Sequence, residues 1–150
     1  MSAHDDPRAG ARRGPFWDVR EGRREPPPAA VLLGWELVAV DPEEGTIEVA
    51  FTATELFTNL AGHIQGGFVA AMLDDTLGPA LVATLGDDEW APTIDLHVQF
   101  LAPALPGRLI GRGRITRRGR DVAFLSGDLR SDSTIVATAM AVAAIQRAVS

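Results

Sequence analysis

Residues 66–85 read GGFVAAMLDDTLGPALVATL, and this stretch decides the fold. Its large apolar residues recur every four positions, and further apolar residues widen the stripe. They are Val69, Leu73, Leu77 and Leu81, with Phe68, Met72 and Ala80 beside them. A stripe of this period is typical of a long helix that packs into a core. Pro79 lies inside the pattern and has no N–H to donate, so we expect the helix to bend or end there.

Segments with the period of a strand lie on both sides of this helix. Residues 34–40 and 47–52 alternate between apolar and polar side chains, and the turn at 41–45 joins them into a predicted hairpin. Four more strands are expected after the helix, at residues 94–100, 108–116, 122–129 and 134–145, with a turn at 117–120. One apolar helix cannot bury itself alone. We therefore predict an α+β fold in which an antiparallel sheet of about six strands wraps around one long central helix.

The 150 residues suit a single domain preceded by a tail. We expect residues 1–33 to form a flexible N-terminal tail with a short apolar segment at Phe16, Trp17 and Val19, and residues 34–150 to form the domain. The prolines at 26–28 should end that segment. Two interpretations of the segment stay open, a flap over an apolar groove and simple packing against the domain.

Composition excludes several classes of function. The net charge is −6 and all fourteen basic residues are arginine, which disfavours general nucleic-acid binding. The chain has no cysteine, so disulfides, thiolate nucleophiles and thiolate metal sites are impossible. The histidines at 4, 63 and 97 share no metal-ligand spacing, and we expect no metal site. Without a secretory signal or an apolar run of about 20 residues, the protein is expected to be cytoplasmic, with no membrane partner.

The predicted helix begins with two consecutive glycines, Gly66 and Gly67. Glycines let a ligand approach the backbone closely. The first amides of a helix have no intrahelical partner and lie at the positive end of the helix dipole. This pattern favours binding of an oxygen that gains negative charge, such as the carbonyl oxygen of a thioester under attack.

Asp74 lies about two turns beyond Gly66. On a helical wheel it shares one side with small residues only, which are Gly67, Ala70, Ala71 and Gly78. An unpaired carboxylate is costly in a core, so this side predicts a groove with an acid at its floor. The alternative is that the glycines only form a tight helix entry and that Asp74 and Asp75 form a solvated pair. Asp75 itself is expected to be a surface or interface acid.

Together, these motifs resemble those of the PaaI-like hotdog-fold acyl-CoA thioesterase family. The resemblance rests on Asn59, Gly62, the Gln-Gly-Gly at 65–67, Asp74 and the Thr-Ile-Asp-Leu at 93–96, and it extends over about residues 34–145. It implies a hotdog fold and hydrolysis of an acyl-CoA thioester to free acid and CoA. It also implies a homodimer or homotetramer with sites at the subunit interface. Coenzyme A would enter as part of the substrate, with no further cofactor.

The resemblance also implies roles for individual residues. Asp74 matches the catalytic carboxylate, which acts as general base or as nucleophile, and Gly66 matches the amide that polarises the thioester carbonyl. Asn59 matches a residue that orients water or substrate, and Thr93 matches a hydroxyl near the acid. Gln65 stands where many members have His, and glutamine can hydrogen-bond but cannot shuttle a proton at neutral pH.

Further residues are expected to bind the substrate. Gly67 and His63 lie beside the helix entry. Arg117, Arg118 and Arg120 crowd one turn and could hold the phosphates of coenzyme A, because a guanidinium donates two parallel hydrogen bonds. Three more arginines share strand parity, at 108, 112 and 114. A solvated outer face is the alternative for all six.

Two other functions stay open on the same fold. Gln65 in place of the usual histidine allows a non-catalytic module that binds an acyl or aromatic ligand. A hydratase is disfavoured, because we find no His–Asp constellation placed for reversible addition of water. His97, on the polar side of its strand, is expected to be structural or to lie at a dimer contact.

Overall fold

A computed structural model describes residues 12–149 and confirms the predicted sheet. Six antiparallel strands lie in the order β1-β2-β5-β6-β7-β4. Their bounds are Glu36–Asp41 (β1), Thr46–Ala53 (β2), Thr93–Phe100 (β4), Gly107–Arg118 (β5), Val122–Ser131 (β6) and Thr134–Ala144 (β7). β1 and β4 are the two edges of this sheet. The turn expected at 117–120 is shorter than predicted, because β5 runs through Arg118.

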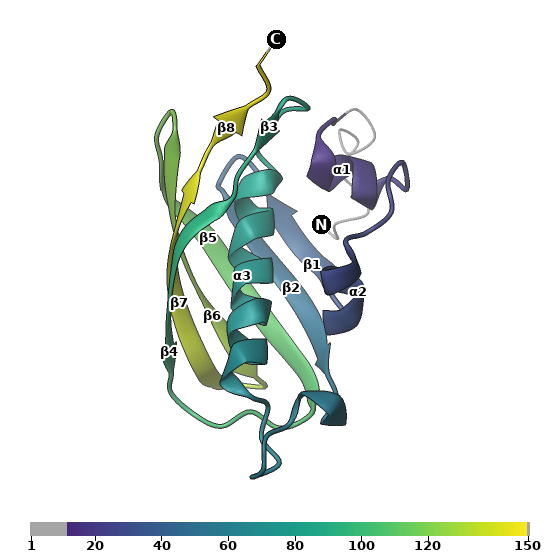
Figure 1. Ribbon diagram of the computed structural model, residues 1–150, viewed down its shortest axis with the longest axis vertical. Helices are drawn as coiled ribbons and strands as arrows, with labels where there is room; N and C mark the ends of the chain where they lie inside the picture. The colour runs from purple at the N-terminus through teal and green to yellow at the C-terminus, as the bar shows by residue number, and fades with distance from the viewer. Residues whose placement is uncertain (1–11, 150) are drawn as a thin grey trace.

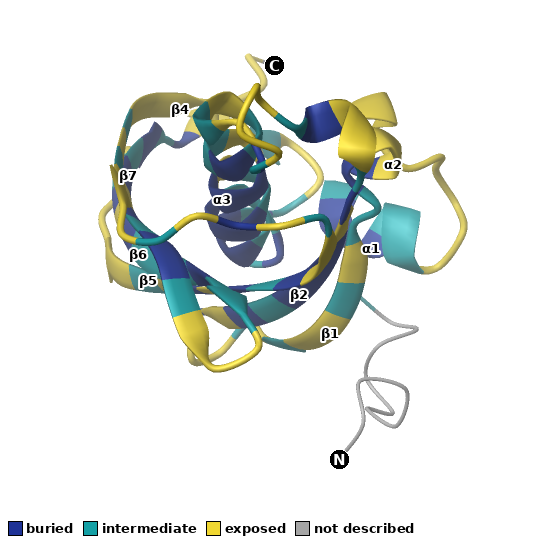
Figure 2. Ribbon diagram, turned by 90° about the horizontal axis from the view of Figure 1, so that it is seen from below, coloured by how far each residue is buried: buried dark blue, intermediate teal, exposed yellow. Residues whose placement is uncertain are grey.

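The central helix α3 spans Gly66–Val82 and lies in the curve of the sheet (Figures 1 and 2). The predicted stripe is confirmed, since Val69, Leu73, Leu77 and Leu81 are all buried, and Met72 and Ala80 with them. Figure 2 shows the buried residues gathered between the helix and the inner face of the sheet. The core of the molecule is therefore one helix face packed against one sheet face.

Glycines in the sheet let the helix approach closely. Gly111 and Gly113 of β5 lie under α3, and a Cβ on Gly113 would lie 3.1 Å from Cδ2 of Leu77. Thr76 packs directly on Gly111 with no exposed surface, and its hydroxyl donates to the Met72 carbonyl at 2.8 Å. The interior has no room for larger side chains at these strand positions.

Pro79 does not end the helix, which continues for three more residues to Val82. A residue with an N–H at position 79 would donate to the carbonyl of Asp75, four residues earlier. In its place the indole Nε1 of Trp35 donates to that carbonyl at 2.8 Å. The proline is tolerated because a side chain from outside the helix satisfies the acceptor that it leaves unpaired.

The N-terminal segment packs against the domain. Residues 1–11 of the expected tail lie outside the described residues. Helix α1, Pro15–Arg20, buries Phe16 and Trp17, and the Trp17 indole donates to the Ala83 carbonyl at 2.9 Å. α1 therefore lies at the end of α3 remote from the paired glycines (Figure 1). This arrangement matches the packing interpretation and not a flap over the groove.

Short elements complete the fold and were not predicted. The helix of the apolar segment ends at Arg20, before the prolines expected to end it, and helix α2, Pro28–Leu33, begins at these prolines because proline fits the first turn of a helix. The 3-10 turn η2 covers Glu55–Phe57, and β3, Glu89–Trp90, pairs with β8, Gln146–Arg147. Strands of two residues are too short to show an alternation of apolar and polar side chains, so the sequence pattern could not predict them. Within residues 12–149, no helix combines the length and apolar character needed to span a bilayer.

Candidate functional site

The start of α3 is held in place by its loop. The Gln65 N–H donates to the Phe57 carbonyl and the Ile64 N–H to the Ala104 carbonyl, both at 2.8 Å. Gln65 is the N-cap residue, so Gly66 and Gly67 are the first two residues of the helix. Their amides find no hydrogen-bond partner among residues 12–149. A carbonyl oxygen can therefore meet two free donors at the positive end of the helix dipole.

A depression of about 340 Å³ lies beside these amides. Its lining includes Asn59, His63 and Gly66, three of the predicted site residues, together with Phe100 and Ala104. The ring of Phe100 is so close that a Cβ on Gly66 would lie 3.2 Å from it. The depression combines polar groups with an apolar wall, as a site for a polar head and an acyl group requires.

Asn59 shapes this loop with its side chain. Its Oδ1 accepts hydrogen bonds from the N–H groups of Ala61, at 3.0 Å, and His63, at 3.2 Å. The side-chain nitrogen is left to donate, so Asn59 can present a donor to a substrate or a water. Gln65 is exposed, does not cap the helix with its side chain and is not part of the lining.

Asp74 and Thr93 lie together, as the resemblance implied. The Thr93 hydroxyl, at the start of β4, donates to Asp74 Oδ1 at 3.0 Å. Asp74 is exposed, and so are Gly67 and Ala71 on the same side of α3. A Cβ on Gly67 would meet no atom within 4 Å. The predicted side of small residues with one carboxylate is therefore an open helix face.

Asp74 and the free amides are too far apart to act together in one protomer. Eight residues separate Asp74 from Gly66, which corresponds to about 12 Å along a helix axis. One thioester carbonyl cannot contact both. The described residues contain one such paired-glycine helix start, so within one protomer Asp74 has no free helix amides beside it.

Asp75, expected to be a surface or interface acid, is half-buried in the described chain. Its Oδ2 is buried and has no hydrogen-bond partner among the described residues. Burial, and secondly the negative charge of Asp74, raise the pKa of the Asp75 carboxyl from 3.8 to about 7. The carboxyl therefore exchanges its proton near neutral pH. No motif marks this residue, and the signal lies in the packing of Trp35 on the helix at this point.

The arginines at the end of β5 lie at the other end of α3 from Gly66. Arg118 donates to the Thr84 hydroxyl and forms an ion pair with Glu89 at 3.8 Å. Arg120 lies 3.8 Å from the carboxylate of Asp121. Arg117 forms no ion pair within residues 12–149. Two of these three arginines are free, or nearly free, to hold another anion.

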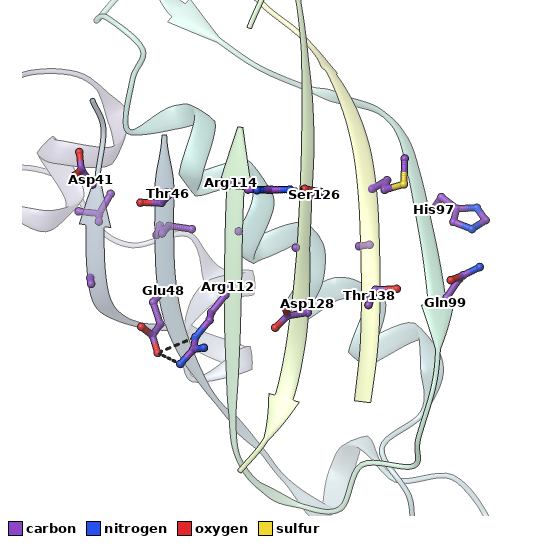
Figure 3. A pocket seen from close by; sticks show the side chains of 17 residues that line it. Asp41, Thr46, Glu48, His97, Gln99, Arg112, Arg114, Ser126, Asp128 and Thr138 are labelled. Carbon is purple, nitrogen blue, oxygen red and sulfur yellow. Dashed lines mark hydrogen bonds and ion pairs between the residues drawn. The ribbon is translucent and has the colours of Figure 1, made fainter. Parts of the chain in front are cut away.

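A concavity of about 760 Å³ lies on the sheet face away from α3 (Figure 3). Arg112 pairs there with Glu48 at 3.4 Å, and Arg114 donates to the Ser126 hydroxyl at 3.3 Å. His97 lines the same concavity. Arg108, nearby on β5, pairs with Glu36 at 3.1 Å. Residues 108, 112 and 114 thus lie on the outer face of the sheet, and the residues predicted at the helix entry and around Asp74 do not line this concavity.

Comparison with known proteins identifies the family of this chain. The sequence profile described as "Thioesterase superfamily" matches residues 61–138. Acyl-coenzyme A thioesterase 13 of Mus musculus is 30% identical over 107 residues, covering 69% of this chain and 73% of that protein. The Homo sapiens protein of the same name is 26% identical with the same coverage.

Solved structures show the same fold. A phenylacetic acid degradation-related protein from Ralstonia eutropha superposes with a TM-score of 0.85 at 41% identity, covering 86% of this chain and 98% of its own. The Escherichia coli PaaI protein superposes with a TM-score of 0.76 at 19% identity, covering 89% and 94%. The predicted hotdog fold and the resemblance to PaaI-like proteins are confirmed. The chain belongs to the thioesterase superfamily.

Proposed function

We propose that this protein hydrolyses an acyl-CoA thioester to a free acid and CoA, with Asp74 as general base or nucleophile. The observation that carries the proposal is the exposed carboxylate of Asp74, held by the Thr93 hydroxyl on a helix face where Gly67 and Ala71 are exposed as well. Thr93 engages Oδ1, which leaves Oδ2 to take a proton from water or to attack the carbonyl carbon. Relatives named acyl-coenzyme A thioesterase support the substrate class.

The acting unit in this proposal is a pair of protomers. Antiparallel packing of two α3 helices brings Asp74 of one copy to the Gly66 and Gly67 amides of the other, across faces built of small residues. Edge strand β4 lies beside this face with Ile94 63% and Phe100 58% exposed. Burying such residues on a sheet edge stabilises a pair. A two-fold axis makes two identical sites.

Each residue then has a defined task. The amides of Gly66 and Gly67 stabilise the oxyanion as it forms, and the side-chain nitrogen of Asn59 donates beside them. Water attacks the carbonyl carbon while Asp74 accepts its proton, and the C–S bond breaks when the tetrahedral intermediate collapses. The CoA thiolate takes the proton back, so the carboxylate is regenerated.

The arginines fit the far end of coenzyme A. Thr84, which Arg118 contacts, lies ten residues beyond Asp74, or about 15 Å along a helix axis. A phosphate held by Arg117 or Arg120 thus lies well beyond the reacting carbonyl, with the extended arm of CoA running between them. Arg118 already donates a hydrogen bond to Thr84 and pairs with Glu89, so we expect its contribution to phosphate binding to be the smallest of the three.

The test is Asp74→Asn, assayed by thiol release with a thiol-reactive dye across short-chain, long-chain and aromatic acyl-CoAs. Loss of a general base should lower kcat by about 10² to 10⁴, with an unchanged melting temperature and unchanged size on a sizing column. Asp87→Asn, an exposed acid in the loop after α3, is the matched control and should keep full activity. Full activity in Asp74→Asn would exclude the assignment.

The same assay tests the alternative of a non-catalytic binding module. The exposed Gln65 side chain, outside the depression, favours this alternative because no proton shuttle replaces the usual histidine. Tight binding of an acyl-CoA in calorimetry, without thiol release from any substrate, would support the binding module and reject hydrolysis.

A further inference from the structure

An aromatic ring from the edge of the sheet rests on the start of the central helix. Phe100 is the last residue of β4 and is 58% exposed. A Cβ on Gly66 would lie 3.2 Å from Cζ and 3.3 Å from Cε1 of Phe100, which are atoms at the tip of the ring. The ring therefore touches the residue whose free amide is proposed to bind the thioester oxygen, although the chemistry described above gives the ring no part in the reaction.

The two glycines at the helix start have different surroundings. Gly66 is covered by the tip of the Phe100 ring, whereas a Cβ on Gly67 would meet no atom within 4 Å. In the proposed pair, the open side at Gly67 is where Asp74 of the second copy arrives. A carbonyl held by the two amides then has the attacking group on its open side and the ring on the other, so the acyl group lies on the side of Phe100.

The depression beside the helix start continues this apolar surface. Its polar lining residues, Asn59 and His63, come from the loop before α3. Its remaining side chains are apolar, and the exposed ones are Phe100 and Leu101, each 58% exposed. Behind them the lining consists of buried apolar residues, namely Ile64, Val69, Ala104 and Val136. No acidic side chain and no arginine is part of the lining, so this half of the depression suits a nonpolar acyl group.

We propose that Phe100 is a specificity-determining residue: its ring packs on the first carbons beyond the thioester carbonyl and selects acyl groups with a nonpolar chain or ring over acetyl. This role rests on the proposed function. Each CH₂ group moved from water onto a nonpolar surface favours binding roughly fourfold, and acetyl has no carbon beyond its methyl group to gain from it. Because the ring touches Gly66, the gain is made with the carbonyl in place and enters kcat/KM.

The experiment measures the ratio of kcat/KM for hexanoyl-CoA to that for acetyl-CoA with the full-length protein. Phe100→Ala should lower this ratio roughly tenfold, and Phe100→Leu should keep most of it. Phe124→Ala is the matched control, because Phe124 of β6 is 46% exposed and does not line the depression. A ratio taken within one preparation is independent of how much protein is folded and paired. An unchanged ratio in Phe100→Ala would overturn the proposal.

A second test uses the contact between the ring and the helix start. Gly66 does not have a positive φ, so alanine fits its backbone, but the added methyl group must displace the Phe100 ring. Gly66→Ala should therefore lower the ratio at least about twofold in the parent and leave it unchanged in the Phe100→Ala background. Equal effects in the two backgrounds would show that the ring does not act from this position.

Calorimetry in the Asp74→Asn background separates this role from the proposed function. Hexanoyl-CoA should bind this variant more tightly than acetyl-CoA does, and Phe100→Ala should remove most of the difference. If the parent releases no thiol from any acyl-CoA, hydrolysis is rejected, and the binding difference still decides whether Phe100 selects the acyl group. If the parent is active, Asp74→Asn is inactive and Phe100→Ala changes neither ratio, the proposed function stands and the role of Phe100 is rejected.

Discussion

The two faces of α3 differ in their surroundings within the chain. One face is packed on the sheet, where Thr76 and Leu77 lie against Gly111 and Gly113. The other face presents Gly67, Ala71 and Asp74 to solvent. Both faces use glycine, on the sheet side to admit the helix and on the open side to leave room. The packed face is complete within one chain, whereas in the proposed function the open face becomes a site only when the helix start of a second copy reaches it.

The largest expected effect comes from one methyl group on the packed side. Gly111→Ala would drive a Cβ into the Thr76 side chain, and the buried helix cannot move away. Overpacking of this kind costs about 1–3 kcal/mol or more, and we expect the upper end in urea unfolding. Gly78→Ala is the matched control, because a Cβ there meets no atom within 4 Å and alanine favours helix by about 0.5–1 kcal/mol. Equal effects of the two substitutions would mean that the faces do not differ.

A charged side chain placed on the open face should prevent two copies from associating without preventing each copy from folding. Ala71 is exposed and takes no part in the proposed chemistry. Ala71→Arg should give a folded monomer in sedimentation, because a second helix would have to bury an unpaired guanidinium. Thiol release should fall about a hundredfold, the size expected for loss of a central interface contact. A fully active monomer would show that one chain carries the whole site.

Asp75, which lies next to Asp74 of the open face, should make the stability of the protein depend on pH. The unfolded carboxyl titrates at its ordinary 3.8 and the folded one near 7, so the folded state binds more protons between these values. Stability therefore falls as pH rises from about 4 to 7 and stays low above 7. The shift sets a ceiling of about 4 kcal/mol, and Asp75→Asn, which does not titrate, should gain about 1–2 kcal/mol relative to the parent at pH 8 and little at pH 4. A pH-independent difference in urea unfolding would contradict this.

The spacing of apolar residues along the sequence predicted the central helix and the six main strands. The stripe through Leu73 and Leu77 became the packed helix face, and alternation placed the six main strands. Two pairs of residues that meet in the folded chain were predicted from the motifs of a family. They are Asn59 with Gly66, around one depression, and Thr93 with Asp74. Those residues lie on different elements, so spacing alone could not have joined them.

What the sequence left unpredicted depends on contacts between distant segments. Nothing in the sequence near Asp75 shows that one of its carboxylate oxygens is buried, or that Trp35, forty residues away, donates to its carbonyl. The helix does not end at Pro79, as one alternative expected, and the reason is again a contact with a distant segment. Local rules treat a proline as a lost hydrogen bond, and only tertiary structure shows whether another donor replaces it.

The smallest expected effect tests that replacement. Trp35→Phe keeps a large ring but leaves the Asp75 carbonyl without its indole donor, which should cost about 1 kcal/mol in urea unfolding. Trp17→Phe, which removes the matching bond to Ala83 at the end of α3, should cost a similar amount. Trp90→Phe should cost almost nothing, since Trp90 is 47% exposed.

The decisive step is to restore the N–H that the proline lacks. Pro79→Ala supplies a backbone donor four residues after Asp75, so in the Trp35→Phe background it should recover most of the lost stability. In the parent the same change should bring little, because the carbonyl already has the indole. Strict additivity of the two substitutions would mean that Trp35 does not replace the missing bond, and that α3 tolerates Pro79 for another reason.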